Sequence, residues 1–326
     1  MDIEADLDVW MEYAWKKEIH GSILAYLGMK KDHFYSVENT VDGKFFVTAR
    51  GWEDLSEILK AYEELGVEIT ENLIGEYLCR DEIARSFFAS YQLYRKYGED
   101  YGLKRLLSGE MAEEEQQKKV KMAEGASFEE RFLVTGLLLS GLNGSFLDYE
   151  KLDKETGAVY QELLHLKAFL HDKKDMTALD EFTDVKKKSL AVRLEAELLN
   201  LEQQTTEEFV IRTLEEFSLT IRKEHITDTE TGFERIRQLF TEMVEKRKDC
   251  AKKISRELKR AFAFMKACFG DGQETVLFVT GLTRNSHAAA FIREYGCDPY
   301  FACSEKLLYR KQEKKLQEEC ESLLKI

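Results

Sequence analysis

The sequence predicts a mainly α-helical fold that contains one small β-hairpin. Charged residues make up 34% of the 326 residues and Pro299 is the only proline, a composition typical of long helices with solvated faces. Apolar side chains recur at intervals of three and four over most of the chain. A chain of this length is expected to form two or three domains of roughly 100 to 200 residues each.

The first part of the chain predicts short helices around the hairpin. Apolar residues at helical spacing predict two helices before residue 30. Phe34–Glu38 and Lys44–Thr48 are rich in aromatic and β-branched side chains, and they flank a polar stretch that contains Asp42 and Gly43. These two segments are therefore predicted to be the strands of the hairpin.

Helical spacing returns after the hairpin. One helix is predicted from Gly51 to a C-cap at Gly66, and two more helices follow before a domain boundary near Leu103. The last of them carries a stripe that we assign to the core, formed by Ile83, Phe87, Tyr91 and Tyr94. Residues 1–103 are therefore predicted to form one domain, a helical bundle with a small hairpin.

Residues 104–326 predict a second region that is also helical. Its first part, residues 109–125, is rich in Glu, Gln and Lys and suits an exposed helix or a flexible connection. Gly141-Leu-Asn-Gly144 is expected to break one helical pattern into two. The region divides into a helical pair (104–175), a long helical hairpin (176–270) and a small mixed α/β end (271–326).

The mixed end predicts one short strand and two helices. Thr275–Thr280 is a compact run of β-branched and apolar residues, so it is expected to be a β-strand. Ser286–Tyr295 predicts a short helix closed by Gly296, and Glu305–Leu324 predicts a charged helix.

Composition and charge exclude several classes of function. The formal net charge of −14 disfavours general binding to nucleic acid or to anionic membranes, because both need a basic surface. The longest apolar run, Phe132–Leu142, is shorter than the roughly 20 residues that cross a bilayer. Six cysteines without a CxxC pair, and no signal peptide, indicate a soluble protein of the reducing cytoplasm.

Two local clusters have competing interpretations. The basic stretch Lys246–Arg260 is interleaved with acidic residues such as Glu245, so a solvated helix face is favoured over a nucleic-acid site. His287, Cys297 and Cys303 are conceivable zinc ligands, but their spacing matches no compact zinc motif. Free structural thiols are favoured there, and no metal site is predicted.

The most informative residue is Arg50. Thr48 is a suitable N-cap for the helix after the hairpin, which places Arg50 in the first helical turn. The helix dipole disfavours a cation at that position by roughly 0.3 to 1 kcal/mol, so the arginine is expected to meet an anion. A phosphate would serve, but Glu53 and Asp54 also lie at the helical spacing that neutralises Arg50 on the surface.

The segment Thr48-Ala-Arg-Gly-Trp-Glu-Asp-Leu-Ser56 resembles the sensor 2 segment of MoxR-type AAA+ ATPases, in which a Pro-Arg or similar dipeptide opens a lid helix. A Leu7–Ala14 helix, an Ile23–Leu27 helix, a hairpin and the arginine helix follow the order of that family's lid. The string is most similar to a clostridial-type branch. Ala49 stands where proline is common, and alanine preserves the helix start because proline there mainly sets φ.

The resemblance implies that residues 1–103 are an AAA+ lid domain and that Arg50 contacts the γ-phosphate of ATP. ATP and Mg²⁺ would be cofactors of the parent protein and not of this chain alone. A P-loop needs the string GxxxxGK[ST], which is absent from these residues, so the chain is expected to be the non-catalytic, C-terminal part of the ATPase. No catalytic residue is assigned.

The partners also follow from the resemblance. Proteins of that family form rings, commonly hexamers, that remodel or activate client proteins, often with a partner that carries a von Willebrand factor A domain. The chain would then contact its own AAA+ core, neighbouring subunits and a client. The alternative is a free-standing helical scaffold or adaptor without nucleotide chemistry, which also explains the missing P-loop. An in-frame P-loop upstream of Met1 in the gene would distinguish the two.

Overall fold

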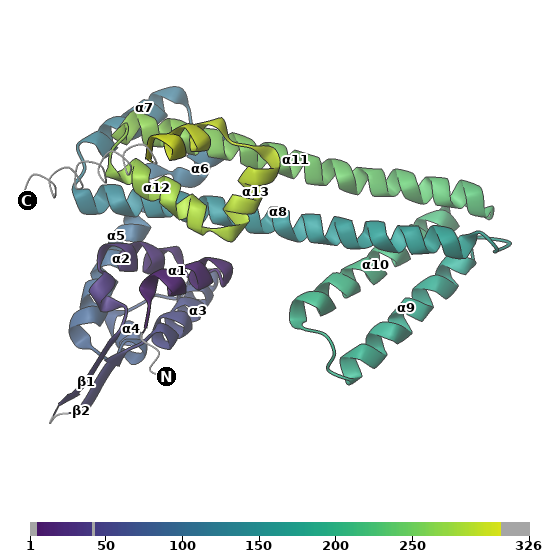
Figure 1. Ribbon diagram of the computed structural model, residues 1–326, viewed down its shortest axis with the longest axis horizontal. Coiled ribbons are helices and arrows are strands. Elements are labelled where there is room, and N and C mark those ends of the chain that lie inside the picture. Colours follow the sequence, from purple (N-terminus) through teal and green to yellow (C-terminus); the bar gives the residue numbers. More distant parts are fainter. Residues whose placement is uncertain (1–4, 41–42, 308–326) are drawn as a thin grey trace, which may run out of the picture. The chain divides into compact units, whose positions relative to one another are not determined.

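A computed structural model describes residues 5–40 and 43–307. Within those residues the chain forms 14 helices and one two-stranded antiparallel hairpin, which confirms the mainly α-helical prediction (Figure 1). The chain divides into two compact units. Unit 1 comprises Met1–Phe146 and Lys253–Ile326, and unit 2 comprises Leu147–Lys252.

Most helices belong to one unit. In unit 1 they are α1 (Leu7–Lys16), α2 (Gly21–Met29), the 3-10 turn η1 (Lys31–His33), α3 (Ala49–Leu65), α4 (Glu71–Tyr77), α5 (Asp81–Tyr101), α6 (Leu103–Ser108), α7 (Glu113–Glu124), α12 (Gln273–Arg284) and α13 (Ser286–Tyr295). In unit 2 they are α9 (Ala178–Glu195) and α10 (Leu201–Lys223). Two long helices contribute residues to both units: α8 (Phe128–Leu170) and α11 (Thr229–Phe269).

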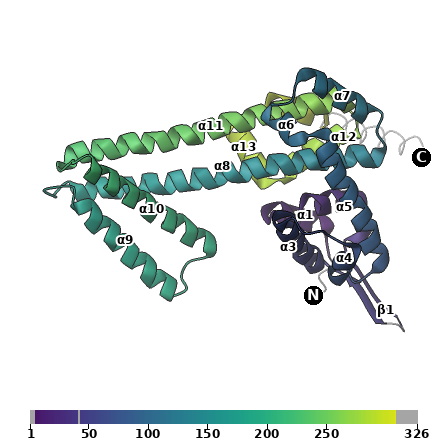
Figure 2. The ribbon, with the colours of Figure 1, turned by 180° about the vertical axis from the view of Figure 1, so that it is seen from behind.

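The predicted hairpin is present. Strands β1 (Ser36–Thr40) and β2 (Gly43–Val47) pair antiparallel, with Ser36 opposite Val47. The backbone N–H of Phe46 also donates to the carbonyl of Cys79 at 3.3 Å, which ties β2 to the residues after α4. The hairpin extends away from the helices around it in both views (Figures 1 and 2).

Trp52 of α3 lies at the centre of the first core in unit 1. Its side chain is fully buried, and its ring packs edge-on against the ring of Phe87 of α5, with 5.3 Å between the ring centroids. The ring centroid of Tyr26 of α2 lies 5.9 Å from that of Trp52. The indole Nε1–H donates to the carbonyl of Phe34 at 3.1 Å. One side chain thus holds α2, α3, α5 and the start of the hairpin together, and the predicted aromatic stripe of α5 is core.

Unit 2 has a core of its own. The buried residues come from α8, α9, α10, α11 and the segment before α9, and include Val159, Leu163, Leu166, Leu170, Met176, Leu179, Phe182, Val210, Leu214, Phe217, Ile221 and Ile236. Helices α9 and α10 also exchange polar contacts: Ser218 Oγ donates to Asp180 Oδ1 at 2.6 Å, and Arg193 forms an ion pair with Glu207.

The expected helix break at Gly141–Gly144 is wrong, because α8 runs without interruption from Phe128 to Leu170. Gly141 allows close packing instead: a Cβ there would lie 2.9 Å from Leu107 Cδ1. Asn143 is buried, and its Oδ1 accepts a hydrogen bond from Asn285 Nδ2 at 2.5 Å. Contacts with residues distant in sequence therefore explain why Gly141 and Asn143 lie inside a helix and do not end it.

The prediction of one long helical hairpin over residues 176–270 is also wrong for its first arm. This arm consists of two helices, α9 and α10. Glu197 adopts a left-handed backbone conformation with φ of 52°, and α9 has ended two residues earlier. Asn200 then starts α10 with a capping box, because its Oδ1 accepts from Gln203 N and Gln203 Oε1 accepts from Asn200 N. The Asn-x-x-Gln spacing was the overlooked signal.

The β-strand predicted at Thr275–Thr280 is a further error, since these residues belong to helix α12. Phe278, Val279 and Leu282 are buried on one face, and this burial outweighs the weak preference of β-branched residues for strands. Helix α13 confirms the prediction for Ser286–Tyr295. Of the charged helix predicted from Glu305, residues 305–307 are helical and residues 308–326 lie outside the described residues.

The domain boundary near Leu103 stays a prediction. Residues 103–125 form α6 and α7, and Leu103, Leu106 and Leu107 are buried. Across this segment, Tyr101 Oη donates to Glu130 Oε1 of α8 at 2.7 Å. Side chains from both sides of residue 103 therefore contact one another within unit 1.

Two glycines of α8 allow a matched stability test. A Cβ on Gly136 would lie 2.8 Å from Ala25 Cβ of α2, whereas a Cβ on Gly144 would meet nothing within 4 Å. We expect Gly136→Ala to destabilise the protein by about 1 to 3 kcal/mol, because α2 and α8 must separate. Gly144→Ala should stabilise it by about 0.5 to 1 kcal/mol through helix propensity. Urea denaturation measures both; equal stabilisation by the two variants would contradict the close α2–α8 contact.

Candidate functional site

Arg50 lies where the sequence predicts, in the first turn of α3. Thr48 is the N-cap, and its Oγ1 accepts a hydrogen bond from Gly51 N at 3.2 Å. The Arg50 side chain is 76% exposed, and its Nε lies 3.0 Å from Asp54 Oδ1 one turn along the helix. The hydrogen bond to Asp54 is the main cause that raises the pKa of Arg50, so the side chain is a permanent cation.

The neighbours of Arg50 in the segment have structural roles. A Cβ on Gly51 would lie 2.8 Å from the carbonyl oxygen of Tyr77, so the close approach of α3 to α4 requires glycine there. Glu53 accepts a hydrogen bond from Tyr13 Oη of α1 at 2.7 Å. Ser56 is buried and accepts from the backbone N–H of His20 at 2.8 Å.

Arg50 differs from these neighbours because, within residues 5–40 and 43–307, its side chain forms a surface ion pair with Asp54 and no other hydrogen bond or ion pair. Such i,i+4 pairs contribute about 0.3 to 0.5 kcal/mol when exposed, and folding does not depend on them. The N-terminal end of α3 adds the positive end of the helix dipole beside the guanidinium. This end of α3 can therefore attract an anion at the surface, and Asp54 is the group that such an anion would displace.

No metal site accompanies Arg50 in the described residues, where no group of three or more His, Cys, Asp or Glu side chains is placed to hold an ion. Cys297 and Cys303 are free thiols, and burial raises the pKa of both. The same residues contain no helix that is both long and apolar enough to cross a membrane.

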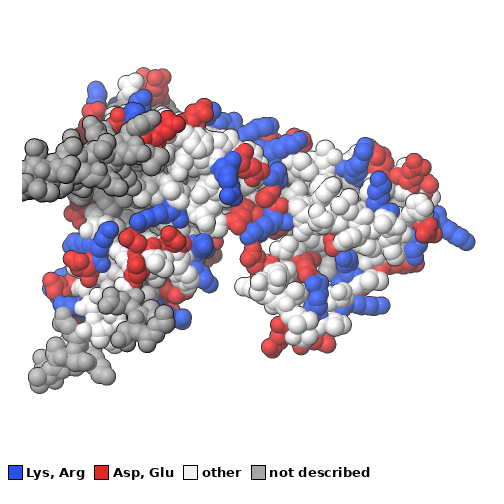
Figure 3. Space-filling model, in the orientation of Figure 1, with Lys and Arg blue, Asp and Glu red and all other residues white. Residues whose placement is uncertain are grey.

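Several lysines in the basic stretch of α11 are paired within their own helix, whereas Arg247 pairs with Asp153 of α8 and Arg260 donates to the carbonyl of Leu107. Lys248 contacts Glu245 at 2.7 Å, and Lys252 contacts Asp249 at 2.9 Å. Basic and acidic side chains are interspersed over the visible face of the described residues (Figure 3). This arrangement supports the interpretation of Lys246–Arg260 as a solvated face.

A second polar cluster lies at the other end of α3, where the sequence offered no signal. His20 Nε2 lies 3.1 Å from Glu63 Oε2, and Tyr91 Oη donates to Glu63 Oε1 at 2.8 Å. Because His20 Nδ1 accepts from Ser22 N at 3.3 Å, its Nε2 carries the proton and donates to Glu63. The cluster joins α2, α3 and α5, and Glu63 is separated in sequence from His20 by 43 positions and from Tyr91 by 28.

The environment of Glu63 favours its ionised form. Partial burial alone would raise the pKa, but hydrogen bonds from His20 and Tyr91 and the nearby charge of Arg95 outweigh it, so the pKa of Glu63 is lowered. Burial and the hydrogen bond to Glu63 raise the pKa of Tyr91, which keeps its hydroxyl a donor.

Comparisons of the chain with models of protein families, with curated proteins and with solved structures found no match. The residues described above therefore carry the functional argument.

The Glu63 cluster predicts a loss of stability in acid. A lowered folded-state pKa contributes stability above the unfolded-state pKa, and this contribution disappears as the pH falls through the folded-state value. Glu63→Gln should therefore lower the free energy of unfolding by about 0.5 to 1 kcal/mol at pH 7, a value reduced because the side chain is partly exposed to solvent. Below about pH 4 the loss of stability should be smaller. Glu64→Gln is the control. Urea titrations from pH 7 to pH 3 measure this; a difference from wild type that stays constant with pH would contradict the assignment.

Proposed function

We propose that the chain is the lid and the client- or partner-binding part of a MoxR-like AAA+ ATPase, which couples ATP binding and hydrolysis to protein remodelling or activation. The observation that carries the proposal is the state of Arg50. It is an exposed cation at the start of a helix, within a segment whose other side chains are used for capping, packing and hydrogen bonding. The order helix, helix, hairpin, arginine helix in α1 to α3 supports it as well.

In this proposal Arg50 exchanges its surface carboxylate for the γ-phosphate of ATP. Hydrogen bonds between a guanidinium and a phosphate are charge-assisted and stronger than neutral ones. The cation then stabilises the charge that moves during phosphoryl transfer, while the phosphate cradle and the Mg²⁺ ligands come from a P-loop core outside these 326 residues. The helices after residue 103 contact the client or a von Willebrand factor A domain partner.

The chain alone should bind no ATP, because a single exposed arginine without a phosphate cradle does not hold a nucleotide. Isothermal titration calorimetry of the chain with ATP and Mg²⁺ is expected to show no binding heat up to millimolar nucleotide. A micromolar dissociation constant would contradict the proposed division of the site between this chain and a separate core.

The role of Arg50 is tested in the gene product that carries a P-loop core in frame before these residues. Arg50→Ala should lower the steady-state ATPase rate by at least about tenfold, because the γ-phosphate loses a charge-assisted donor. The melting temperature should stay within about a degree, because an exposed i,i+4 pair contributes only about 0.3 to 0.5 kcal/mol.

Arg85→Ala is the matched control for this experiment. Arg85 is also exposed, at 71%, and it forms a similar surface ion pair with Glu71 at 3.2 Å. Loss of the Arg85 side chain should change neither the steady-state ATPase rate nor the melting temperature. Wild-type activity of Arg50→Ala, or the absence of an in-frame P-loop upstream, would reject the ATPase proposal and favour a helical scaffold or adaptor.

A further inference from the structure

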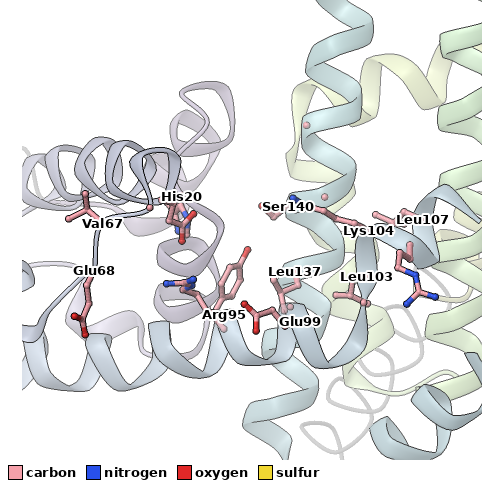
Figure 4. A pocket seen from close by; sticks show the side chains of 18 residues that line it. His20, Val67, Glu68, Arg95, Glu99, Leu103, Lys104, Leu107, Leu137 and Ser140 are labelled. Atoms are coloured by element: carbon pink, nitrogen blue, oxygen red, sulfur yellow. The ribbon is translucent and has the colours of Figure 1, made fainter. Parts of the chain in front are cut away.

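A cleft of about 950 Å³ lies in unit 1 beside the His20–Glu63 pair. Its walls come from the C-terminal end of α3 and from α5, α6 and α8 (Figure 4). Leu103, Leu107 and Leu137 give it apolar walls, and its volume is at the upper end of the range of about 300 to 1,000 Å³ that ligand sites occupy.

Charged side chains of both signs line the cleft, and three of them have no ion-pair partner among the described residues. Lys104, Glu68 and Glu99 form no ion pair with any residue in the described ranges 5–40 and 43–307. Arg95 hydrogen-bonds with Tyr91 and lies near the charge of Glu63. Arg105, which also lines the cleft, is different, because its two terminal nitrogens lie 3.0 and 2.7 Å from the carboxylate of Glu115. The side chains of Lys104, Glu68 and Glu99 are therefore available to a ligand.

The inner part of the cleft offers neutral hydrogen-bonding groups. Tyr94 is buried, and burial raises its pKa to about 12, so its hydroxyl is protonated at neutral pH and hydrogen-bonds with Ser140. The ring centroid of His20, which also lines the cleft (Figure 4), lies 6.0 Å from that of Tyr94. A Cβ on Gly21 would lie 2.3 Å from Tyr94 Oη, so the start of α2 holds this hydroxyl in place.

We infer that this cleft binds a short peptide segment in which an apolar residue is flanked by charges of both signs. A simple anion would be repelled by Glu68 and Glu99, and a simple cation by Arg95 and Lys104. A peptide can pair with both sets while an apolar side chain contacts the leucine walls. The site is distinct from the proposed nucleotide contact, because Glu63 is 13 residues from Arg50 along α3, about 20 Å at the helical rise.

The test is selection from a random heptapeptide phage library on three forms of the chain: wild type, Gly144→Trp and Gly157→Trp. Gly144 lines the cleft and a Cβ there meets nothing within 4 Å, so tryptophan fills the cleft without a backbone clash. Gly157 lies in the same helix, away from the cleft, and its Cβ also meets nothing within 4 Å, so Gly157→Trp controls for the substitution itself.

Wild type and Gly157→Trp are expected to enrich the same peptides, which combine apolar, acidic and basic residues, and Gly144→Trp is expected to lose them. The enriched peptide, synthesised with a fluorescent label, should bind at least about tenfold more weakly to Gly144→Trp by fluorescence polarisation. Charge reversal by Lys104→Glu should weaken it similarly, whereas Lys96→Glu, an equal charge change outside the cleft, should not.

Three results would overturn the inference: no enriched peptide family on wild type, enrichment that Gly144→Trp leaves unchanged, or equal effects of Lys104→Glu and Lys96→Glu. Circular dichroism of each variant verifies that loss of binding is not loss of fold. The measurement needs no nucleotide, so its failure and a failure of the Arg50 test are independent outcomes.

Discussion

The burial of Trp52 is the interaction on which the first core of unit 1 depends. Its ring contacts Phe87 and Tyr26, and its indole N–H satisfies the carbonyl of Phe34 just before the hairpin. A buried donor without a partner would cost about 1 to 3 kcal/mol, so this hydrogen bond fixes the orientation of the ring as well as its position. Because Trp52 follows Arg50 by two residues, the same contacts fix the first turn of α3 and aim Arg50 at solvent.

The two ends of α3 have different characters as a result. At the N-terminal end, residues 48–56 carry the exposed cation Arg50. At the C-terminal end Glu63 receives hydrogen bonds from His20 and Tyr91, which join α2 and α5 to the helix. A displacement of α3 along its axis would affect both ends, since the helix between them is continuous. The polar cluster at the C-terminal end therefore contributes to fixing the position of Arg50.

Local signals predicted much of the fold, and tertiary contacts account for the errors. The hairpin and the ends of α3 follow from residues that act on their neighbours: aromatic and β-branched strands, Thr48 as a cap and Gly66 in a left-handed conformation. Gly141 and Thr275–Thr280 were misassigned, because their roles depend on residues far away in the sequence. Leu107 requires the space that Gly141 leaves, and burial of α12 overrides strand propensity.

The same distinction applies to the candidate site. Arg50 could be found from sequence, because its cap, its helix position and its counter-ions lie within six residues of one another. The cluster of His20, Glu63 and Tyr91 could not, because a lone histidine gives no indication of a carboxylate 43 residues away. The unpaired charges of the cleft were equally hidden, since charged residues are common in this chain and only the structure distinguishes Arg105, which is paired, from Lys104.

The ion pair between Arg50 and Asp54 is compatible with a role in anion binding. Its energy of about 0.3 to 0.5 kcal/mol is small, because both side chains are exposed and water screens their attraction. A phosphate offers more charge and more acceptor oxygens than one carboxylate, and it lies favourably near the positive end of a helix dipole. Exchange of Asp54 for phosphate therefore costs little. Asp54 holds the guanidinium at the surface of the first turn of α3, where the proposed nucleotide contact would form.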